Sequence, residues 1–130
     1  MRRTAVLALS LTALVVMAAC GGGGEATPAP AAVATPVNGV VQVTISERDI
    51  EPKVVSIKVG EEVTFQVTSE NSYHTFTIED ADEQEIAHLR VRRDTTETAA
   101  VTIDQPGTYV FYCRVTGHRG FGEEGQLIVE

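Results

Sequence analysis

The sequence predicts an all-β domain of about eight short strands, folded as a sandwich or a small barrel. Apolar and polar residues alternate with period two from residue 40 onward, as in strands that bury one face. Residues typical of turns separate these runs, and no segment has a sustained helical period. Once the first 39 residues are set aside, about ninety remain, which is enough for one domain with a modest core.

The predicted strands follow one another closely along this domain. In the first of them, Val41, Val43 and Ile45 alternate with polar residues, and the strand at 108–115 is long and aromatic. The eight strands are expected at 41–46, 55–59, 63–67, 73–78, 86–92, 97–103, 108–115 and 126–129. Turns are expected between them, at 60–61, 70–72, 105–107 and 117–125.

The first twenty residues are typical of a bacterial lipoprotein signal peptide. Arg2 and Arg3 precede an apolar run at 5–19, which is short for a membrane span. The run ends at Cys20 in a sequence similar to a lipobox, so we expect Cys20 to be acylated and to anchor the protein to a membrane. The alternative is ordinary cleavage after a small residue, with Cys20 removed or incidental.

Residues 21–39 are rich in Gly, Ala, Pro and Thr, and we predict a linker there, followed by the domain at 40–130. The formal net charge is −8, and it becomes more negative once the two leader arginines are removed. Nucleic acids and anionic lipid headgroups attract basic surfaces, so we expect neither as a partner. An acidic surface fits a soluble domain or one that meets a basic protein.

Cys113 and His118 stand at the two ends of a short loop between the last two predicted strands. Cys113 ends the core-facing row of the strand at 108–115, where a lone Cys is usually a small inert residue. A thiolate and an imidazole separated by four residues can, however, turn toward one centre, and this pair suits copper. The third ligand should be another histidine, for which His74 and His88 are the candidates.

The segments around these residues form a specific pattern. They are GTYVFYC at 107–113, GHRG at 117–120 and GEEGQLIV at 122–129, with YHTF at 73–76 further upstream. The three C-terminal segments resemble the copper loop of cupredoxins, the plastocyanin and azurin family, and the upstream one resembles that family's first ligand strand. The resemblance implies an eight-stranded Greek-key β-sandwich that binds one copper ion.

By this resemblance, His74, Cys113 and His118 form the trigonal ligand set of a blue-copper site. It also implies that the backbone N–H of Thr75 donates a hydrogen bond to the Cys113 sulfur. His88 is then expected to be a surface histidine. Asn71 and Ser72, which precede His74, are expected to serve turn chemistry, with a role in ordering the loop before His74 as the alternative.

The sequence departs from the family at the axial position, where Glu123 stands in place of the usual methionine. Both methionines, Met1 and Met17, lie in the predicted leader, so no methionine remains to replace it. The axial ligand is therefore Glu123, a backbone oxygen such as that of Tyr73, water, or nothing. A carboxylate is harder than a thioether, so it would stabilise Cu(II), lower the reduction potential and improve the fit for zinc.

We accordingly expect an extracytoplasmic, lipid-anchored and monomeric electron-transfer protein with one copper ion, rather than an enzyme. The alternative is a copper or zinc binding or delivery module without redox work. Three histidines are too few for the additional sites of copper enzymes, and Gly117 stands where a dinuclear copper centre would need a second cysteine. The expected partner is a redox protein such as a cytochrome or a terminal oxidase.

The expected docking surface lies around His118, whose ring edge is exposed in the family, together with Phe121. A run of five acidic residues at 79–85 is expected on a loop. Such runs are usually only solvated, but this one offers a surface that could steer a basic partner.

Overall fold

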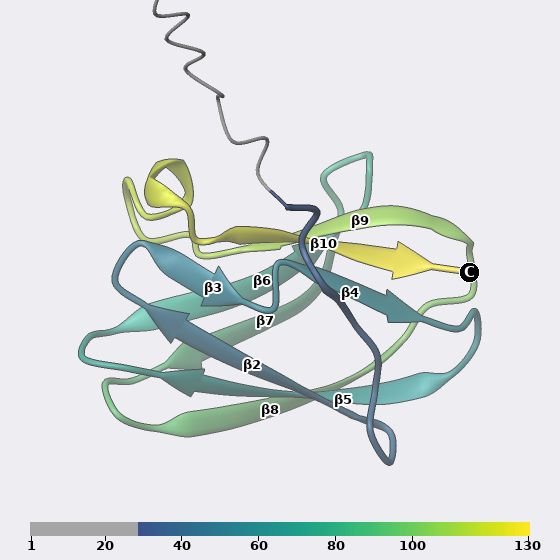
Figure 1. The fold of residues 1–130 in the computed structure, drawn as a ribbon, viewed down its shortest axis with the longest axis horizontal. Coiled ribbons are helices and arrows are strands. Elements are labelled where there is room, and N and C mark those ends of the chain that lie inside the picture. Colours follow the sequence, from purple (N-terminus) through teal and green to yellow (C-terminus); the bar gives the residue numbers. More distant parts are fainter. Residues whose placement is uncertain (1–28) are drawn as a thin grey trace, which may run out of the picture.

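Two β-sheets packed face to face make up the part of the chain that the computed structural model describes, residues 29–130 (Figure 1). The six-stranded sheet has the order β1 (Val33–Ala34), β4 (Val54–Ile57), β10 (Glu124–Val129), β9 (Gly107–Tyr112), β6 (His74–Glu79) and β7 (Glu85–Val91). The four-stranded sheet has the order β3 (Asp49–Glu51), β2 (Val40–Ser46), β5 (Glu62–Ser69) and β8 (Thr96–Thr102). The predicted all-β sandwich is confirmed.

All eight predicted strands are present, and the alternation that predicted them decides which side chains are buried. In β2 the side chains of Val41, Val43 and Ile45 face inward, and β5 buries every second residue in the same way. β1 and β3 are additional strands of two and three residues, too short to show a period in the sequence. β9 ends at Tyr112, three residues before the predicted end.

The core lies between the two sheets and has a row of three phenylalanines at its centre. The ring of Phe65 on β5 is 5.6 Å from that of Phe76 on β6, which is 5.5 Å from that of Phe111 on β9. These centroid distances are typical of favourable aromatic pairs. Aliphatic side chains from both sheets complete the core, which packs against β6 and β9.

A tight turn joins β2 to β3, which pair as an antiparallel hairpin with Ser46 opposite Asp49. Arg48 in this turn has a φ of 72°, in the left-handed region. The turn belongs to the four-stranded sheet, yet it reaches the segment that leads into β10 of the other sheet. There the Arg48 amide donates a hydrogen bond to the Glu123 side chain.

The acidic run at 79–85 is divided between two strands and the turn that joins them. Glu79 ends β6 and is 7% exposed, whereas Glu85 begins β7. Arg114 pairs with both carboxylates, at 2.5 Å and 2.6 Å respectively. Hydrogen bonding to Arg114 holds the pKa of Glu79 below its usual value. The expectation that the whole run lies on a loop is therefore wrong for these two residues, because they lie on strands and share the single positive charge of Arg114.

The segment predicted as a linker contributes β1, whose two residues run parallel to Val54 and Val55 of β4. Within residues 29–130, no helix reaches the length and apolarity that crossing a membrane requires. The predicted signal peptide and Cys20, the predicted acylation site, lie outside the described residues.

Candidate metal centre

The side chains of His74, Cys113, His118 and Glu123 converge at one end of the sandwich. Their donor atoms lie within 4.8 Å of one another. Glu123 Oε2 is 2.8 Å from His74 Nδ1 and 3.0 Å from His118 Nδ1. Cys113 Sγ is 4.0 Å and 3.7 Å from the same two nitrogens, which are 3.3 Å apart. The structure thus brings together the four predicted residues.

His88, the other histidine candidate, does not belong to this group. It lies on β7 and is half-buried, and its Nδ1 is hydrogen-bonded to Thr77 Oγ1 at 2.8 Å. The residues alone left His74 and His88 open as the third ligand, and the resemblance favoured His74. The structure places His74 in the group, at the start of β6 and next to β9. Glu123 points into the group and not toward solvent.

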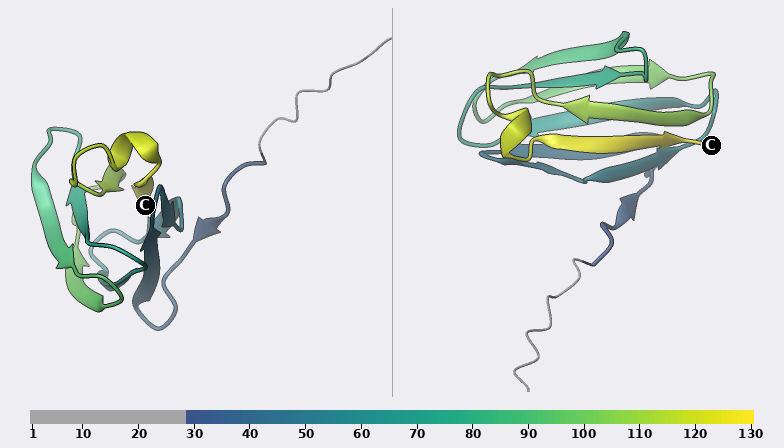
Figure 2. Two further views of the ribbon diagram at one scale, coloured as in Figure 1. Left: turned by 90° about the vertical axis from the view of Figure 1, so that its left-hand side faces the viewer. Right: turned by 90° about the horizontal axis from the view of Figure 1, so that it is seen from above.

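Three of the four residues come from residues 113–123, the ligand loop, which connects β9 to β10. Its ends are closed by a hydrogen bond from the Cys113 N–H to the Glu123 carbonyl, at 3.0 Å. Inside the loop a 3₁₀ turn, η1 (Arg119–Phe121), follows His118, and the Glu123 N–H donates to the His118 carbonyl at 3.2 Å. This folding brings the three ligand-loop side chains to the same point. Figure 2 shows η1 at one end of the strands, opposite the C-terminus.

Glycine is required where the ligand loop leaves η1. Gly122 has a φ of 117°, and a Cβ at this position would lie 2.7 Å from the Arg48 carbonyl oxygen. The β2–β3 turn therefore packs directly against the ligand loop. Lys53 holds the loop from the same side, because its Nζ donates to the Gly122 carbonyl at 2.6 Å.

The centre is dry except on one side. His74 is 0% exposed, Cys113 and Glu123 are each 1% exposed, and only the His118 side chain, at 25%, reaches the surface. Burial raises the pKa of the Cys113 thiol, while backbone hydrogen bonds from Thr75 and Val115 oppose this rise. A buried thiol of raised pKa is a poor nucleophile, which counts against hydrolytic chemistry at this cysteine.

Two hydrogen-bond donors from Thr75 face the sulfur. Its backbone N–H donates to Cys113 Sγ at 3.3 Å, which confirms the contact expected from the resemblance. Its hydroxyl lies 3.7 Å from the sulfur and also accepts the Arg114 N–H at 2.7 Å. The hydroxyl contact is not predicted by the family pattern, although a threonine beside a predicted ligand is a visible signal for it.

Replacing Thr75 by valine should lower the reduction potential of the copper-loaded protein. Donors to a thiolate withdraw electron density from sulfur, so losing one strengthens the bond to Cu(II). A hydrogen bond of about 0.5–1.5 kcal/mol corresponds to a decrease of roughly 20–60 mV for one electron. Protein-film voltammetry measures this, with Thr77→Val as the control, because Thr77 is also buried on β6 but contacts His88. Equal shifts in both variants would contradict a role for the hydroxyl.

The donor set fits one transition-metal ion. A thiolate, two imidazole nitrogens and a carboxylate oxygen together suit copper or zinc and do not suit magnesium or calcium. Bonds of about 2.0–2.3 Å to one ion require donors about 3–4 Å apart. Five of the six donor pairs are 2.8 to 4.0 Å apart, and all of them lie within 4.8 Å. Within residues 29–130, these four side chains form the one cluster of three or more His, Cys, Asp and Glu residues that could hold a metal ion.

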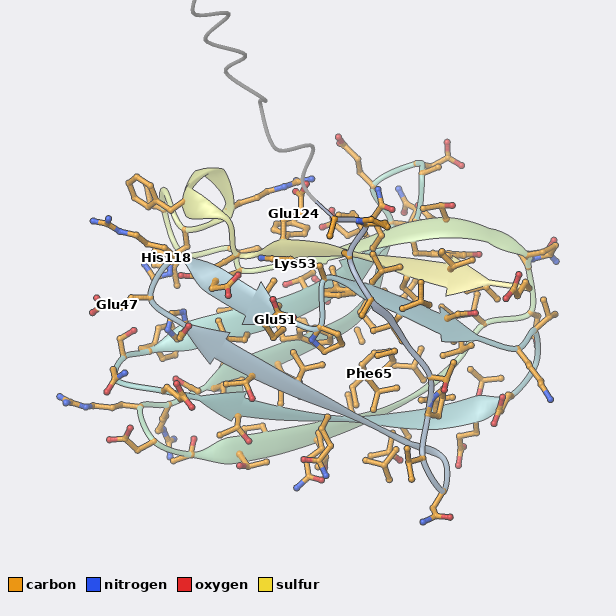
Figure 3. All side chains as sticks on the ribbon, in the orientation of Figure 1. Glu47, Glu51, Lys53, Phe65, His118 and Glu124 are labelled. Atoms are coloured by element: carbon orange, nitrogen blue, oxygen red, sulfur yellow. The ribbon has the colours of Figure 1, made fainter. Side chains whose placement is uncertain are left out.

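The surface around His118 is partly apolar. Tyr73 is 45% exposed and Phe121 63% exposed, and both line a hollow that His118 and Glu123 also border. Arg48 lies over the Phe121 ring, 5.6 Å from its centroid. Figure 3 shows His118 and Glu47 at this end of the sandwich, with Phe65 between the sheets. The exposed edge of the centre is therefore framed by aromatic side chains.

Comparisons with known proteins agree with the fold and identify the family. A family model described as "Cupredoxin-like domain" matches residues 9–129. Plastocyanin from Hordeum vulgare is 34% identical over 84 residues, which is 61% of this chain. The chain spans about half the length of that relative, 53%.

Solved structures of similar shape include auracyanins. The reduced auracyanin of Roseiflexus castenholzii has a TM-score of 0.64 and 21% identity, covering 71% of this chain and 97% of its own. Auracyanin A of Chloroflexus aurantiacus, described as a "blue" copper protein, has a TM-score of 0.59 and 18% identity, covering 70% of this chain and 99% of its own. These likenesses support the fold. The family model covers nearly all of the sequence, so the chain belongs to the cupredoxin-like domain family, which binds one copper ion.

Proposed function

We propose that this protein transfers single electrons through one copper ion held by His74, Cys113, His118 and Glu123. The observation that carries the proposal is the dry donor group at one end of the sandwich, of which only the His118 side chain reaches the surface. Copper supplies a one-electron change between Cu(II) and Cu(I) in such a set. The chain holds four donors in fixed positions and excludes water from three of them.

The aromatic surface beside His118 is the proposed docking site for the redox partner. Tyr73 and Phe121 offer exposed apolar area, and aromatic residues are enriched where proteins meet. A partner bound there would lie against the exposed edge of His118, close to the donor group. We propose that this partner is a cytochrome or an oxidase, and that the protein acts as a carrier and not as an enzyme.

The proposed location is extracytoplasmic, with a lipid anchor at Cys20. The apolar run that ends at Cys20 supports this location, and residues 21–39 would then link the anchor to the domain. The protein is proposed to act as a monomer, because the acidic chain carries a net charge that opposes self-association.

Copper loading of the purified protein tests the proposal. We expect the Cu(II) form to show an intense thiolate-to-copper absorption band in the visible range. Ascorbate should bleach this band and ferricyanide should restore it, over repeated cycles. Cys113→Ser is the control, since it removes the sulfur and should remove the band. A colourless protein that retains zinc tightly and does not cycle would instead indicate a metal-binding or delivery module.

A further inference from the structure

The two rings of the donor group differ in what contacts their outer nitrogen. Both His74 and His118 direct Nδ1 into the group. On His74 the other nitrogen, Nε2, lies 2.8 Å from the hydroxyl of Ser72. On His118, no hydrogen bond to the other nitrogen occurs within residues 29–130, and this side chain is partly exposed.

The direction of the hydrogen bond between Ser72 and His74 follows from the role of Nδ1. A neutral imidazole carries one proton, and a nitrogen that binds a metal must offer its lone pair. With Nδ1 toward the metal, Nε2 carries the proton and donates it to Ser72 Oγ. Because His74 is 0% exposed, water does not readily replace the hydroxyl as the acceptor.

The backbone of Ser72 is held in place by the loop between β5 and β6. Ser69, which is 1% exposed, donates its hydroxyl proton to the Ser72 carbonyl at 2.5 Å. The Ser72 N–H donates to the Glu70 carbonyl at 2.9 Å, and the Asn71 N–H donates to Asp94 Oδ1 at 3.2 Å. Asn71 has a φ of 68°, which makes the tight loop possible. These contacts fix the backbone of Ser72 and so place its side chain beside the His74 ring.

We propose that Ser72 is a positioning residue of the copper site, which directs Nδ1 of His74 to the metal and strengthens it as a ligand. An acceptor on the outer N–H fixes the tautomer and the ring orientation, and it raises the basicity of the ligating nitrogen. A more basic nitrogen favours Cu(II) over Cu(I). This role extends the turn chemistry expected for Ser72, and it rests on the proposed binding of copper by His74.

Replacing Ser72 by alanine tests the role through metal affinity. Competition with chelators should show Cu(II) and Zn(II) bound about 10–100-fold more weakly, with Cu(I) affected less. Each tenfold decrease in the ratio of Cu(II) to Cu(I) affinity raises the reduction potential by about 59 mV. Ser72→Thr keeps the hydroxyl and should restore most of the affinity. Ser56→Ala is the matched control, because it removes a hydroxyl that contacts Glu130, at the far end of β4.

A second measurement reads the hydrogen bond directly. In the diamagnetic Cu(I) and Zn(II) forms, the His74 ring N–H should give a slowly exchanging proton signal in the wild type and in Ser72→Thr. In Ser72→Ala, this signal should exchange with water much faster. Thermal unfolding of each variant shows whether the fold is kept, so that a lost signal is assigned to the hydroxyl and not to unfolding.

The outcomes separate this proposal from the proposed function. If the wild type shows no thiolate-to-copper band but Ser72→Ala weakens Zn(II) binding, electron transfer is wrong and the positioning role stands. If the wild type cycles normally while Ser72→Ala keeps the wild-type affinities, potential and proton signal, the positioning role is overturned.

Discussion

Replacing Glu123 by glutamine is expected to raise the reduction potential of the copper site by on the order of 100 mV. The carboxylate is buried and within 3.0 Å of both ligand nitrogens, so its charge acts on the metal with little screening. At an effective dielectric constant of about 20, a unit charge about 4 Å away contributes roughly 4 kcal/mol, and glutamine retains part of this through its carbonyl dipole. Cu(II) loses more of this stabilisation than Cu(I). Voltammetry measures the shift.

The neighbouring residue gives the matched control for this change. Glu124 carries the same charge, but it is partly exposed and pairs with Arg119, outside the donor group. Glu124→Gln should therefore leave the potential and the visible spectrum close to those of the wild type. Glu123→Gln should also weaken Zn(II) binding, because zinc accepts carboxylate oxygen readily. An unchanged potential and spectrum in Glu123→Gln would show that the carboxylate does not ligate copper.

Replacing Gly125 by alanine should destabilise the protein by about 3 kcal/mol. An added Cβ would lie 2.3 Å from two atoms of the Phe111 ring and 2.7 Å from the Lys53 carbonyl oxygen. Phe111 is fully buried among core side chains, and the Lys53 carbonyl accepts the Gln126 N–H at 2.8 Å, so neither neighbour can move freely. Urea unfolding of the metal-free protein measures the loss.

Gly120 is the control for this substitution. It lies in η1 of the ligand loop, and nothing lies within 4 Å of a Cβ built on it. Gly120→Ala should leave the free energy of unfolding nearly unchanged. If both substitutions lower the free energy of unfolding equally, the steric explanation for Gly125 is wrong. The decrease then reflects only the general effect of replacing glycine by alanine.

The alternation of apolar and polar residues was sufficient to predict most of the fold, because a half-buried strand places every second side chain in the core. The eight longer strands follow from that alternation. β3 could not be predicted in the same way, because its three residues form a strand only through pairing with β2. β9 was predicted too long, because Arg114 and Val115 continue an apparent strand pattern while the chain has already turned into the ligand loop.

The donor residues were found from spacing and resemblance, but their surroundings depend on contacts across the fold. Cys113, His118 and Glu123 lie within eleven consecutive residues, so a motif can reveal them. The Arg48 amide that holds Glu123 Oε1 at 3.2 Å is 75 residues away in the chain, and its role depends on a backbone turn. The sequence therefore left four possibilities for the axial position, which only three-dimensional packing could narrow.

The contact between Arg48 and Glu123 links metal binding to the packing of the two sheets. Arg48 belongs to the four-stranded sheet, whereas the ligand loop continues the six-stranded sheet. A metal that binds only the folded state adds its binding free energy to the stability of that state. The four donors all lie on β6 or on the ligand loop, so the ion itself is bound by the six-stranded sheet. By fixing the Glu123 side chain, the ion stabilises the hydrogen bond from the Arg48 amide, which joins the two layers at this end of the sandwich. Loss of the metal should let the layers part first at that end.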